Sequence, residues 1–357
     1  MSKLASVKPK AVQSLPSSPV TLETLASGDA LPAVVTAERV MGSEAGSAGS
    51  AGSHVGAGAL REWAIAYRAL IERTLATTGG LLFRGFTVPD ADTFRAFVTE
   101  MAPELLEYKE RSTPRTEVGG RIYTSTEYPA HQHIALHNEF SYAFTWPLRI
   151  AFFALRPADE GGETPIADSR KVYASMAPDV RERFATRGVM YVRNYGTGVD
   201  LSWQDAFQTG DRAEVETYCR RAPLHWEWLD GDRLRTRQIR PAVGRHPETD
   251  EMVWFNQAHL FHVSNLGAEG ETSMRSVFAD EDLPRNAYYG DGAPISTEDL
   301  AEVRRALDAA TVVFPWQQGD VLLLDNMLIA HGRRPYRGAR TILAALAQPY
   351  TLPIDTR

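Results

Sequence analysis

Leu136-His137-Asn138-Glu139 and, far downstream, His331-Gly332-Arg333 are the two stretches that decide the fold of this chain. In a β-strand, every second side chain points to the same face, so one strand can present both His137 and Glu139 to one side. A third ligand must then come from another strand, which in an open double sheet can be remote in sequence. Two imidazoles and one carboxylate can occupy one face of an Fe(II) ion and leave the other face open. The pattern therefore predicts a metal site between strands of a double sheet, although a His-X-Glu tripeptide by itself also arises by chance.

The residues around His331 add context. Gln318-Gly319-Asp320 is typical of a turn, and the apolar residues 321–324 indicate a buried strand that leads toward the histidine. We therefore expect His331 at a strand end, facing a pocket. Arg340 stands at the entrance to a further apolar strand, and an arginine there needs an acidic partner. It is either half of a salt bridge at the surface or a clamp that grips one carboxylate of a dicarboxylic cosubstrate.

Hydrophobic patterning predicts a mainly β protein with flanking helices (α+β), built on a double-stranded β-helix, or jelly-roll, core. Short apolar runs typical of strands alternate with stretches whose apolar residues recur at helical spacing. A capping box at Ser296 opens the last helix. The expected strands are 31–35, 81–83, 150–155, 252–256, 311–314, 321–324 and 341–347, and the expected helices are 60–78, 90–102, 169–189 and 297–309.

The chain organisation follows from composition. Residues 1–30 are rich in Ser, Pro and Ala and predict a loose tail or extended arm, and 31–357 predict a single jelly-roll domain. Residues 42–59 are almost all Gly, Ala and Ser and predict a flexible loop. Residues 194–250 are polar, aromatic and irregular, which suits a lid or inserted segment.

Composition also excludes several classes of partner. The chain has 357 residues and a formal net charge of −7, and no long Lys/Arg block suggests binding to nucleic acid. One cysteine, Cys219, rules out an internal disulfide and a cysteine-based metal cluster. No apolar run approaches the roughly 18 residues of a membrane helix, and the N-terminus is not a secretory signal. We expect a cytoplasmic protein with a small-molecule substrate.

Other histidines admit plain interpretations. His131, His133 and His137 have spacing compatible with a zinc-like cluster, but the first two follow Pro129 in an expected loop, and a second metal site is disfavoured. His259 and His262 have helix-turn spacing, which favours structural roles. Arg84 in Arg84-Gly85-Phe86 is expected to brace the fold.

Several blocks together resemble the TauD/TfdA superfamily of Fe(II)/2-oxoglutarate-dependent dioxygenases, in particular its SyrP-like branch, which resembles clavaminate synthase in using Glu as the acidic ligand. The likeness spans about residues 79–348, and its blocks occur in the family's order. The blocks are 123–129, 136–139, 161–168, 194–196, 254–257 and 331–336.

This resemblance implies roles for individual residues. His137, Glu139 and His331 would be the iron ligands, and Arg340 would bind the distal carboxylate of the cosubstrate 2-oxoglutarate, with Thr164 contacting the same carboxylate. O2 would be the second cosubstrate. The candidate substrate residues are Tyr195, Trp203, Asn256 and Arg334. Trp203 could instead pack a lid, and Arg334 could lie in a solvated loop.

The resemblance further implies hydroxylation of an amino acid or an amino-acid-derived molecule, free or tethered to a carrier protein, in specialised (antibiotic-type) metabolism. Related halogenases replace the ligand carboxylate with a small residue, so Glu139 favours hydroxylation. Desaturation, epoxidation and cyclisation use the same iron centre and stay open. Two other classes are a non-catalytic jelly-roll binding protein and a zinc hydrolase using the same ligands.

Overall fold

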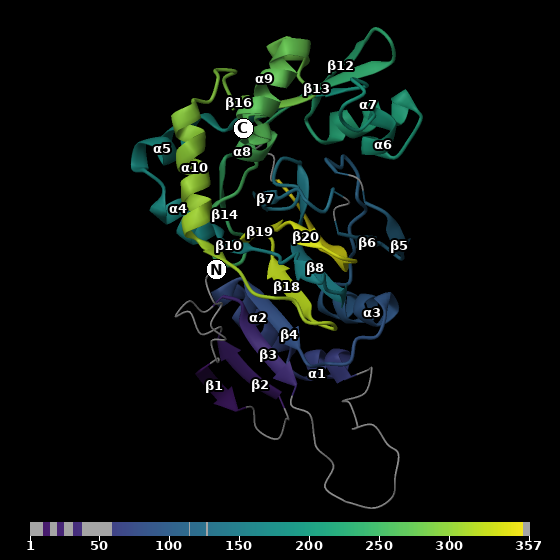
Figure 1. Cartoon of the computed structure of the whole chain (residues 1–357), viewed down its shortest axis with the longest axis vertical. Coiled ribbons are helices and arrows are strands. Elements are labelled where there is room, and N and C mark those ends of the chain that lie inside the picture. Colours follow the sequence, from purple (N-terminus) through teal and green to yellow (C-terminus); the bar gives the residue numbers. More distant parts are fainter. Residues whose placement is uncertain are drawn as a thin grey trace, which may run out of the picture.

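We analysed a computed structural model that describes residues 10–14, 20–24, 31–37, 59–113, 115–125 and 128–352. Figure 1 shows a central β-structure with the N-terminal strands and helices at one end and a separate group of strands and helices at the other. The expected flexible loop, 42–59, lies outside the described residues except for Ala59, where the first helix begins.

A large sheet forms the base of the fold. In the described part of the chain it has nine strands, with order β1-β2-β3-β4-β18-β8-β21-β6-β5. Their bounds are β1 Lys10–Ser14, β2 Val20–Thr24, β3 Ala33–Ala37, β4 Gly80–Arg84, β18 Val321–Asp325, β8 Thr145–Arg156, β21 Thr341–Thr351, β6 Ile122–Thr124 and β5 Glu117–Gly119. Figure 1 shows β18 and β8 near the middle of the molecule.

The two faces of this sheet bury different layers, as strand alternation requires. On β18, Val321 and Leu323 belong to a cluster shared with the helices α1 (Ala59–Ala66), α2 (Arg68–Thr78) and α3 (Ala91–Met101). Leu322 and Leu324 point the other way, into the larger core cluster. The large sheet is thus covered by helices on one side and by further β-structure on the other.

A smaller sheet covers the second face. It has the order β17-β10-β19-β7 among the described residues. The bounds are β17 Thr311–Val312, β10 Ile166–Asp168, β19 Ile329–Arg333 and β7 Ile134–His137. Ile166 and Leu136 of this sheet share the larger core cluster with Leu322 of the large sheet. The arrangement confirms the predicted double-stranded β-helix.

The segment 194–250 is not irregular, which corrects the sequence interpretation. Much of it belongs to a third sheet with helices packed beside it, visible around β12, β13 and α7 in Figure 1. The alternation is masked in the sequence by charged residues that pair across the strands, as Glu227 does opposite Arg235. The strands of this third sheet are β11 Val189–Tyr195, β12 His225–Leu229, β13 Arg233–Arg240 and β16 Arg285–Tyr289. The segment also contains the helices α6 Trp203–Phe207 and α7 Arg212–Arg221 and the separate strand β14 Val243–Arg245.

The remaining elements connect the sheets. Ser296 accepts a hydrogen bond from the Asp299 backbone N–H, which confirms the expected cap of the last long helix. The bounds are α4 Ser169–Ser175, α5 Pro178–Arg187, α8 Ala258–Phe261, α9 Gly267–Val277, α10 Thr297–Ala309, the 3₁₀ turns Val263–Leu266 and Asp280–Asp282, and the two-stranded pairs β14 with β15 (Met252–Trp254) and β9 (Glu160–Gly161) with β20 (Tyr336–Arg337).

Two further expectations need correction. The described parts of the N-terminal 30 residues are strands, not a loose tail, because β2 pairs with β3 over its whole length and β3 in turn lies beside β4. The strand expected over 31–35 is therefore β3, which lies between β2 and β4 in the large sheet. The helix expected over 60–78 is divided at Tyr67, whose φ of −113° and ψ of 22° leave the helical region. The assignment of residues 31–357 to a single domain stays a prediction.

Candidate metal centre and its cavities

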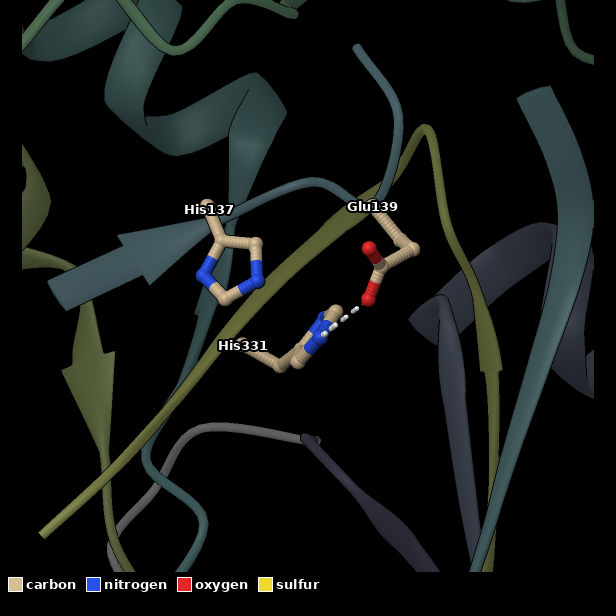
Figure 2. A group of neighbouring side chains, drawn as sticks. All are labelled: His137, Glu139 and His331. Atoms are coloured by element: carbon tan, nitrogen blue, oxygen red, sulfur yellow. Dashed lines mark ion pairs between the residues drawn. The ribbon is translucent and has the colours of Figure 1, made fainter. Parts of the chain in front are cut away.

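His137, Glu139 and His331 lie together, as predicted (Figure 2). His137 is the last residue of β7 and His331 is the middle residue of β19, and the two are register partners in the antiparallel pair. One ligand atom from each of the three residues lies within 4.8 Å of the others. In the described part of the chain, no other group of three His, Cys, Asp or Glu residues meets this criterion.

The route by which Glu139 reaches the site differs from the expectation. β7 ends at His137, and Glu139 lies in the turn that follows, next to Phe140 with a φ of 57°. Asn326, in the turn between β18 and β19, holds this turn: its Oδ1 accepts the Glu139 N–H at 2.7 Å, and its Nδ2 donates to the Glu139 carbonyl at 2.9 Å. His331 also differs, because it lies inside β19 rather than at a strand end.

The donor set fits a divalent iron ion. His137 Nδ1 lies 2.9 Å from the Ala135 carbonyl, so it carries the proton there and leaves the Nε2 lone pair for a metal. Burial lowers the pKa of His137, and burial followed by the neighbouring His137 lowers the pKa of His331 well below its usual value. Both imidazoles are therefore neutral, as metal ligation requires. Two neutral imidazoles and one carboxylate form the facial set typical of non-haem Fe(II).

Two side chains orient the Glu139 carboxylate. Tyr108 donates its hydroxyl to Oε1 at 3.0 Å, and Arg115 Nη2 donates to Oε2 at 2.6 Å. Burial alone would lower the pKa of Arg115, but Glu139 outweighs this effect and the pKa is raised. A permanently charged guanidinium therefore lies against the carboxylate and, together with the Tyr108 hydroxyl, fixes its orientation.

A small cavity of ≈ 360 Å³ adjoins the two histidines. Thr164 and Arg340 line it together with His331, as the family pattern implies. Arg340 is held by the Gly162 carbonyl at 3.0 Å and the Ser125 hydroxyl at 3.1 Å. No carboxylate of a described residue forms an ion pair with it, so the structure gives no support to the salt-bridge alternative. Burial, with Arg333 nearby, lowers the pKa of Arg340 to about 10.

A larger cavity of ≈ 1050 Å³ opens on the other side of His137 and Glu139. Its wall combines apolar side chains with one ion pair. Arg285 Nε and Nη2 donate to the two carboxylate oxygens of Asp200 at 2.8 and 2.5 Å. The cavity also contacts Gln257, whose side chain donates to the Asn138 carbonyl at 2.7 Å. The site therefore has one compartment for a small anion and one for a larger molecule.

Comparisons with known proteins agree with this geometry. The family model described as "Taurine catabolism dioxygenase TauD, TfdA family" matches residues 51–346. The chain belongs to this dioxygenase family. It is therefore an Fe(II)/2-oxoglutarate-dependent oxygenase, which is an oxidoreductase. The family assignment does not support the two alternatives, a zinc hydrolase and a non-catalytic binding protein.

Two curated relatives and one solved structure show how far the likeness extends. The chain is 44% identical over 279 residues to the dapdiamide synthesis protein DdaC of Enterobacter agglomerans, covering 78% of this chain and 85% of that protein. It is 32% identical over 289 residues to a clavaminate synthase-like protein of Arabidopsis thaliana, covering 78% and 84%. In fold it is similar to PvcB of Pseudomonas aeruginosa, an Fe, α-ketoglutarate-dependent oxygenase from an isonitrile synthetic pathway, with a TM-score of 0.50, 16% identity and coverage of 94% and 93%.

The four candidate substrate residues do not line the larger cavity of the dioxygenase. Tyr195 and Trp203 are buried in a core cluster of the third sheet. Asn256 is buried and donates to the Ala242 carbonyl at 2.7 Å, while accepting from the Ala258 N–H. Arg334 lines a different cavity, which Arg304 also lines. Tyr195, Trp203 and Asn256 are buried in the protein interior, and the assignment of all four residues to substrate binding stays a prediction.

Two histidines outside the metal centre, His259 and His262, make structural contacts, as the sequence indicates. His259 is buried, and its Nε2 lies 2.8 Å from the Leu136 carbonyl. His262 accepts the Ser264 N–H at its Nδ1 and begins a 3₁₀ turn. His133 lines the larger cavity, but neither it nor His131 belongs to the metal group found among the described residues. Arg84 pairs with Asp320 at 2.6 Å and braces the large sheet, as expected.

Sequence reasoning missed the residues that support the ligands and shape the cavities. Asn326 follows an apolar strand in an Asp-Asn turn, which is a signal for a capping side chain. Tyr108, Arg115, Asp200 and Arg285 carry no such signal, because they lie in loops or at strand ends whose partners are distant in sequence.

Proposed function

We propose that this dioxygenase hydroxylates an unactivated C–H bond of an amino acid or amino-acid-derived molecule in specialised metabolite biosynthesis. The observation that carries the proposal is the ≈ 1050 Å³ cavity that shares His137 and Glu139 with the metal centre. A substrate in that cavity lies beside the ligands without entering the smaller compartment. We also propose a cytoplasmic location; none of the described helices is long and apolar enough to cross a membrane.

The chain's own residues divide the work between the two compartments. Iron, when bound, couples the oxidative decarboxylation of 2-oxoglutarate, which gives succinate and carbon dioxide, to oxidation of the substrate. His137, Glu139 and His331 would hold the metal, and Arg340 with Thr164 would hold the distal carboxylate of the cosubstrate. Trp316 fixes the Thr164 side chain by donating its indole N–H to Oγ1 at 3.1 Å. The substrate cavity then needs only to orient one C–H bond and exclude water.

The wall of the larger cavity supports an amino-acid-like substrate. Asp200 and Arg285 place one anion and one cation side by side, and Arg285 keeps 22% of its side-chain surface exposed. Its Nη1 forms no hydrogen bond with a described residue, so this donor is available to a carboxylate. Phe261, Leu260 and Leu283 supply an apolar surface nearby. A molecule with a charged amino-acid end and an apolar or neutral remainder matches this wall.

The curated relatives support the biosynthetic context. DdaC is named for the synthesis of dapdiamide, and the Arabidopsis relative is named as clavaminate synthase-like. Val199 and Asp200 come from the segment expected to act as a lid, and both line the cavity, which supports a role for it in closing over the substrate. Delivery of the substrate as a free molecule or tethered to a carrier protein gives two variants of this proposal.

Retention of Glu139 favours hydroxylation over halogenation, because the carboxylate occupies a position that a halide would otherwise need. Desaturation, epoxidation and cyclisation are the alternative outcomes at the same centre. Mass spectrometry separates these outcomes into two groups: hydroxylation and epoxidation add one oxygen atom, whereas desaturation and ring formation remove two hydrogen atoms.

The test is incubation of the iron-loaded protein with 2-oxoglutarate, O2 and a panel of free and carrier-bound amino acids. We expect succinate formation that increases with the correct substrate and a product that gains one oxygen atom. His331→Ala is the control and should give neither. Succinate formation with no oxidised amino acid-type product, but with oxidation of another substrate class, would refute the substrate assignment while leaving the oxygenase activity intact.

A further inference from the structure

Arg115 is a buried cation with unmet hydrogen-bonding capacity. Its side chain is 3% exposed, and its Nη2 donates to Glu139 Oε2 at 2.6 Å. Its Nε and Nη1 are also buried, yet neither has a hydrogen-bond partner among the described residues. Burying N–H groups of a charged side chain without acceptors is costly, so the arrangement indicates that an acceptor is supplied from outside the chain.

The position of Arg115 indicates which acceptor this is. Arg115 lines the ≈ 360 Å³ cavity together with Thr164, His331 and Arg340. Arg340 is anchored by Gly162 and Ser125, away from Glu139, whereas Arg115 is anchored on Glu139 itself. The same small cavity thus has one cation beside the ligand carboxylate and a second one elsewhere on its wall. A ligand with two carboxylates can place one against the Arg115 guanidinium and the other against the Arg340 guanidinium.

We propose that Arg115 is a second carboxylate-binding residue for 2-oxoglutarate, and that its free N–H groups receive the carboxylate of the 2-oxo acid end while Arg340 receives the distal one. The proposal rests on the assignment of this cavity to the cosubstrate. It adds a function to a residue that otherwise only supports Glu139, and it makes one guanidinium contact both an iron ligand and the cosubstrate.

This double contact has an energetic rationale. Glu139 and the 2-oxo acid carboxylate are two anions that must lie close together at the metal, and a planar guanidinium can donate to both from different edges. Arg115 is also held in place by Tyr108, whose ring lies 4.6 Å from the guanidinium carbon. Its orientation is therefore fixed before the cosubstrate arrives, which lowers the entropic cost of binding.

Tyr108 provides a matched control. It donates to the other oxygen of Glu139 at 3.0 Å but does not line the cosubstrate cavity. Tyr108→Phe therefore removes one support of the ligand carboxylate without removing a contact to 2-oxoglutarate. A residue that acts only by positioning Glu139 should resemble Tyr108 in every binding measurement.

The experiment compares wild type, Arg115→Gln, Arg115→Lys and Tyr108→Phe, each saturated with Mn(II) in place of iron. The Mn(II) dissociation constant is measured by electron paramagnetic resonance, and the 2-oxoglutarate dissociation constant by calorimetry. We expect Arg115→Gln to weaken 2-oxoglutarate binding at least about tenfold relative to Tyr108→Phe, the scale of a hydrogen bond to a charged group. Arg115→Lys retains the charge beside Glu139, so it preserves folding, and it should also weaken 2-oxoglutarate because one ammonium cannot serve both carboxylates.

Equal 2-oxoglutarate affinities in the metal-saturated Arg115 and Tyr108 variants would overturn the proposal and leave Arg115 as a support of Glu139. Failure of the metal-saturated wild type to bind 2-oxoglutarate would instead overturn the cosubstrate assignment itself, and the proposal with it. The two failures are distinguishable, because the first leaves wild-type binding intact.

Discussion

His137 and His331 are register partners on adjacent antiparallel strands, although 193 positions separate them along the chain. Their rings lie 4.6 Å apart, between centroids. Strand pairing, not a local motif, therefore brings the two imidazoles together. The pairing of β7 with β19 therefore sets the spacing of the two imidazoles, and the turn after β7 sets the position of Glu139.

Asn326 should be the residue that fixes this turn. Replacing it by Ala leaves the Glu139 N–H and carbonyl and the Pro147 carbonyl without their buried partner. We expect Asn326→Ala to lower the free energy of unfolding by about 2–4 kcal/mol, since each unsatisfied buried group costs about 1–3 kcal/mol. Urea denaturation of the metal-free protein measures this. Asn265→Ala, at an exposed position, is the control; a similar loss in both variants would contradict the assignment.

Arg340→Leu should weaken 2-oxoglutarate binding by about 1.5–3 kcal/mol, because it removes a charge-assisted contact in a buried cavity. Mn(II) affinity should stay unchanged, since Arg340 has no hydrogen bond or ion pair with the three metal-binding residues. Titration of Mn(II) into the metal-free protein measures the metal affinity, and calorimetry on the Mn(II)-loaded protein measures the 2-oxoglutarate affinity. The control is Arg337→Leu, whose side chain is 84% exposed. Unaltered 2-oxoglutarate affinity in Arg340→Leu would show that another residue binds the distal carboxylate.

The metal ligands and the buried strands are the parts of the molecule that the sequence alone predicts. His137, Glu139 and His331 could be identified because ligand chemistry restricts the residue types and the family pattern gives the spacing. The apolar runs of β8, β18 and β21 could be recognised because strands buried on both faces carry long hydrophobic stretches.

What the sequence did not reveal are contacts between polar residues in separate loops. Arg115 reaches Glu139 from a loop, and Asp200 reaches Arg285 across a long interval of chain. Tyr195 and Trp203 lie in a core cluster, and the sequence could not show this because an aromatic residue in a core and one in a pocket have the same sequence signature. Neither periodicity nor composition encodes which loops meet.

Arg285 tests the substrate assignment. Arg285→Gln should raise KM for substrates that carry a free carboxylate at least about tenfold, because a charge-assisted hydrogen bond is lost. Their amide counterparts should be affected much less, and succinate formed without substrate should be unchanged, because the smaller cavity does not include Arg285. Steady-state kinetics with carboxylate and amide pairs gives the comparison. Equal losses for both members of a pair would show that Arg285 acts on the cavity's shape and not on a substrate carboxylate.

His259 should make the stability of the metal-free protein depend on pH. Burial lowers the pKa of His259 to about 4, while an unfolded histidine titrates near about 6.5. The unfolded state therefore takes up a proton first, so stability is complete above about pH 6.5 and decreases as the pH falls toward about 4. Between about pH 7.5 and about pH 5 this one residue should cost about 2 kcal/mol. His259→Gln can still donate to the Leu136 carbonyl and should remove the contribution of His259 to this loss of stability.

The control is His225→Gln on β12, which tests whether removal of any histidine has the same effect. Urea denaturation at the two pH values measures the difference; parallel pH profiles for wild type and His259→Gln would show that the buried imidazole does not resist protonation.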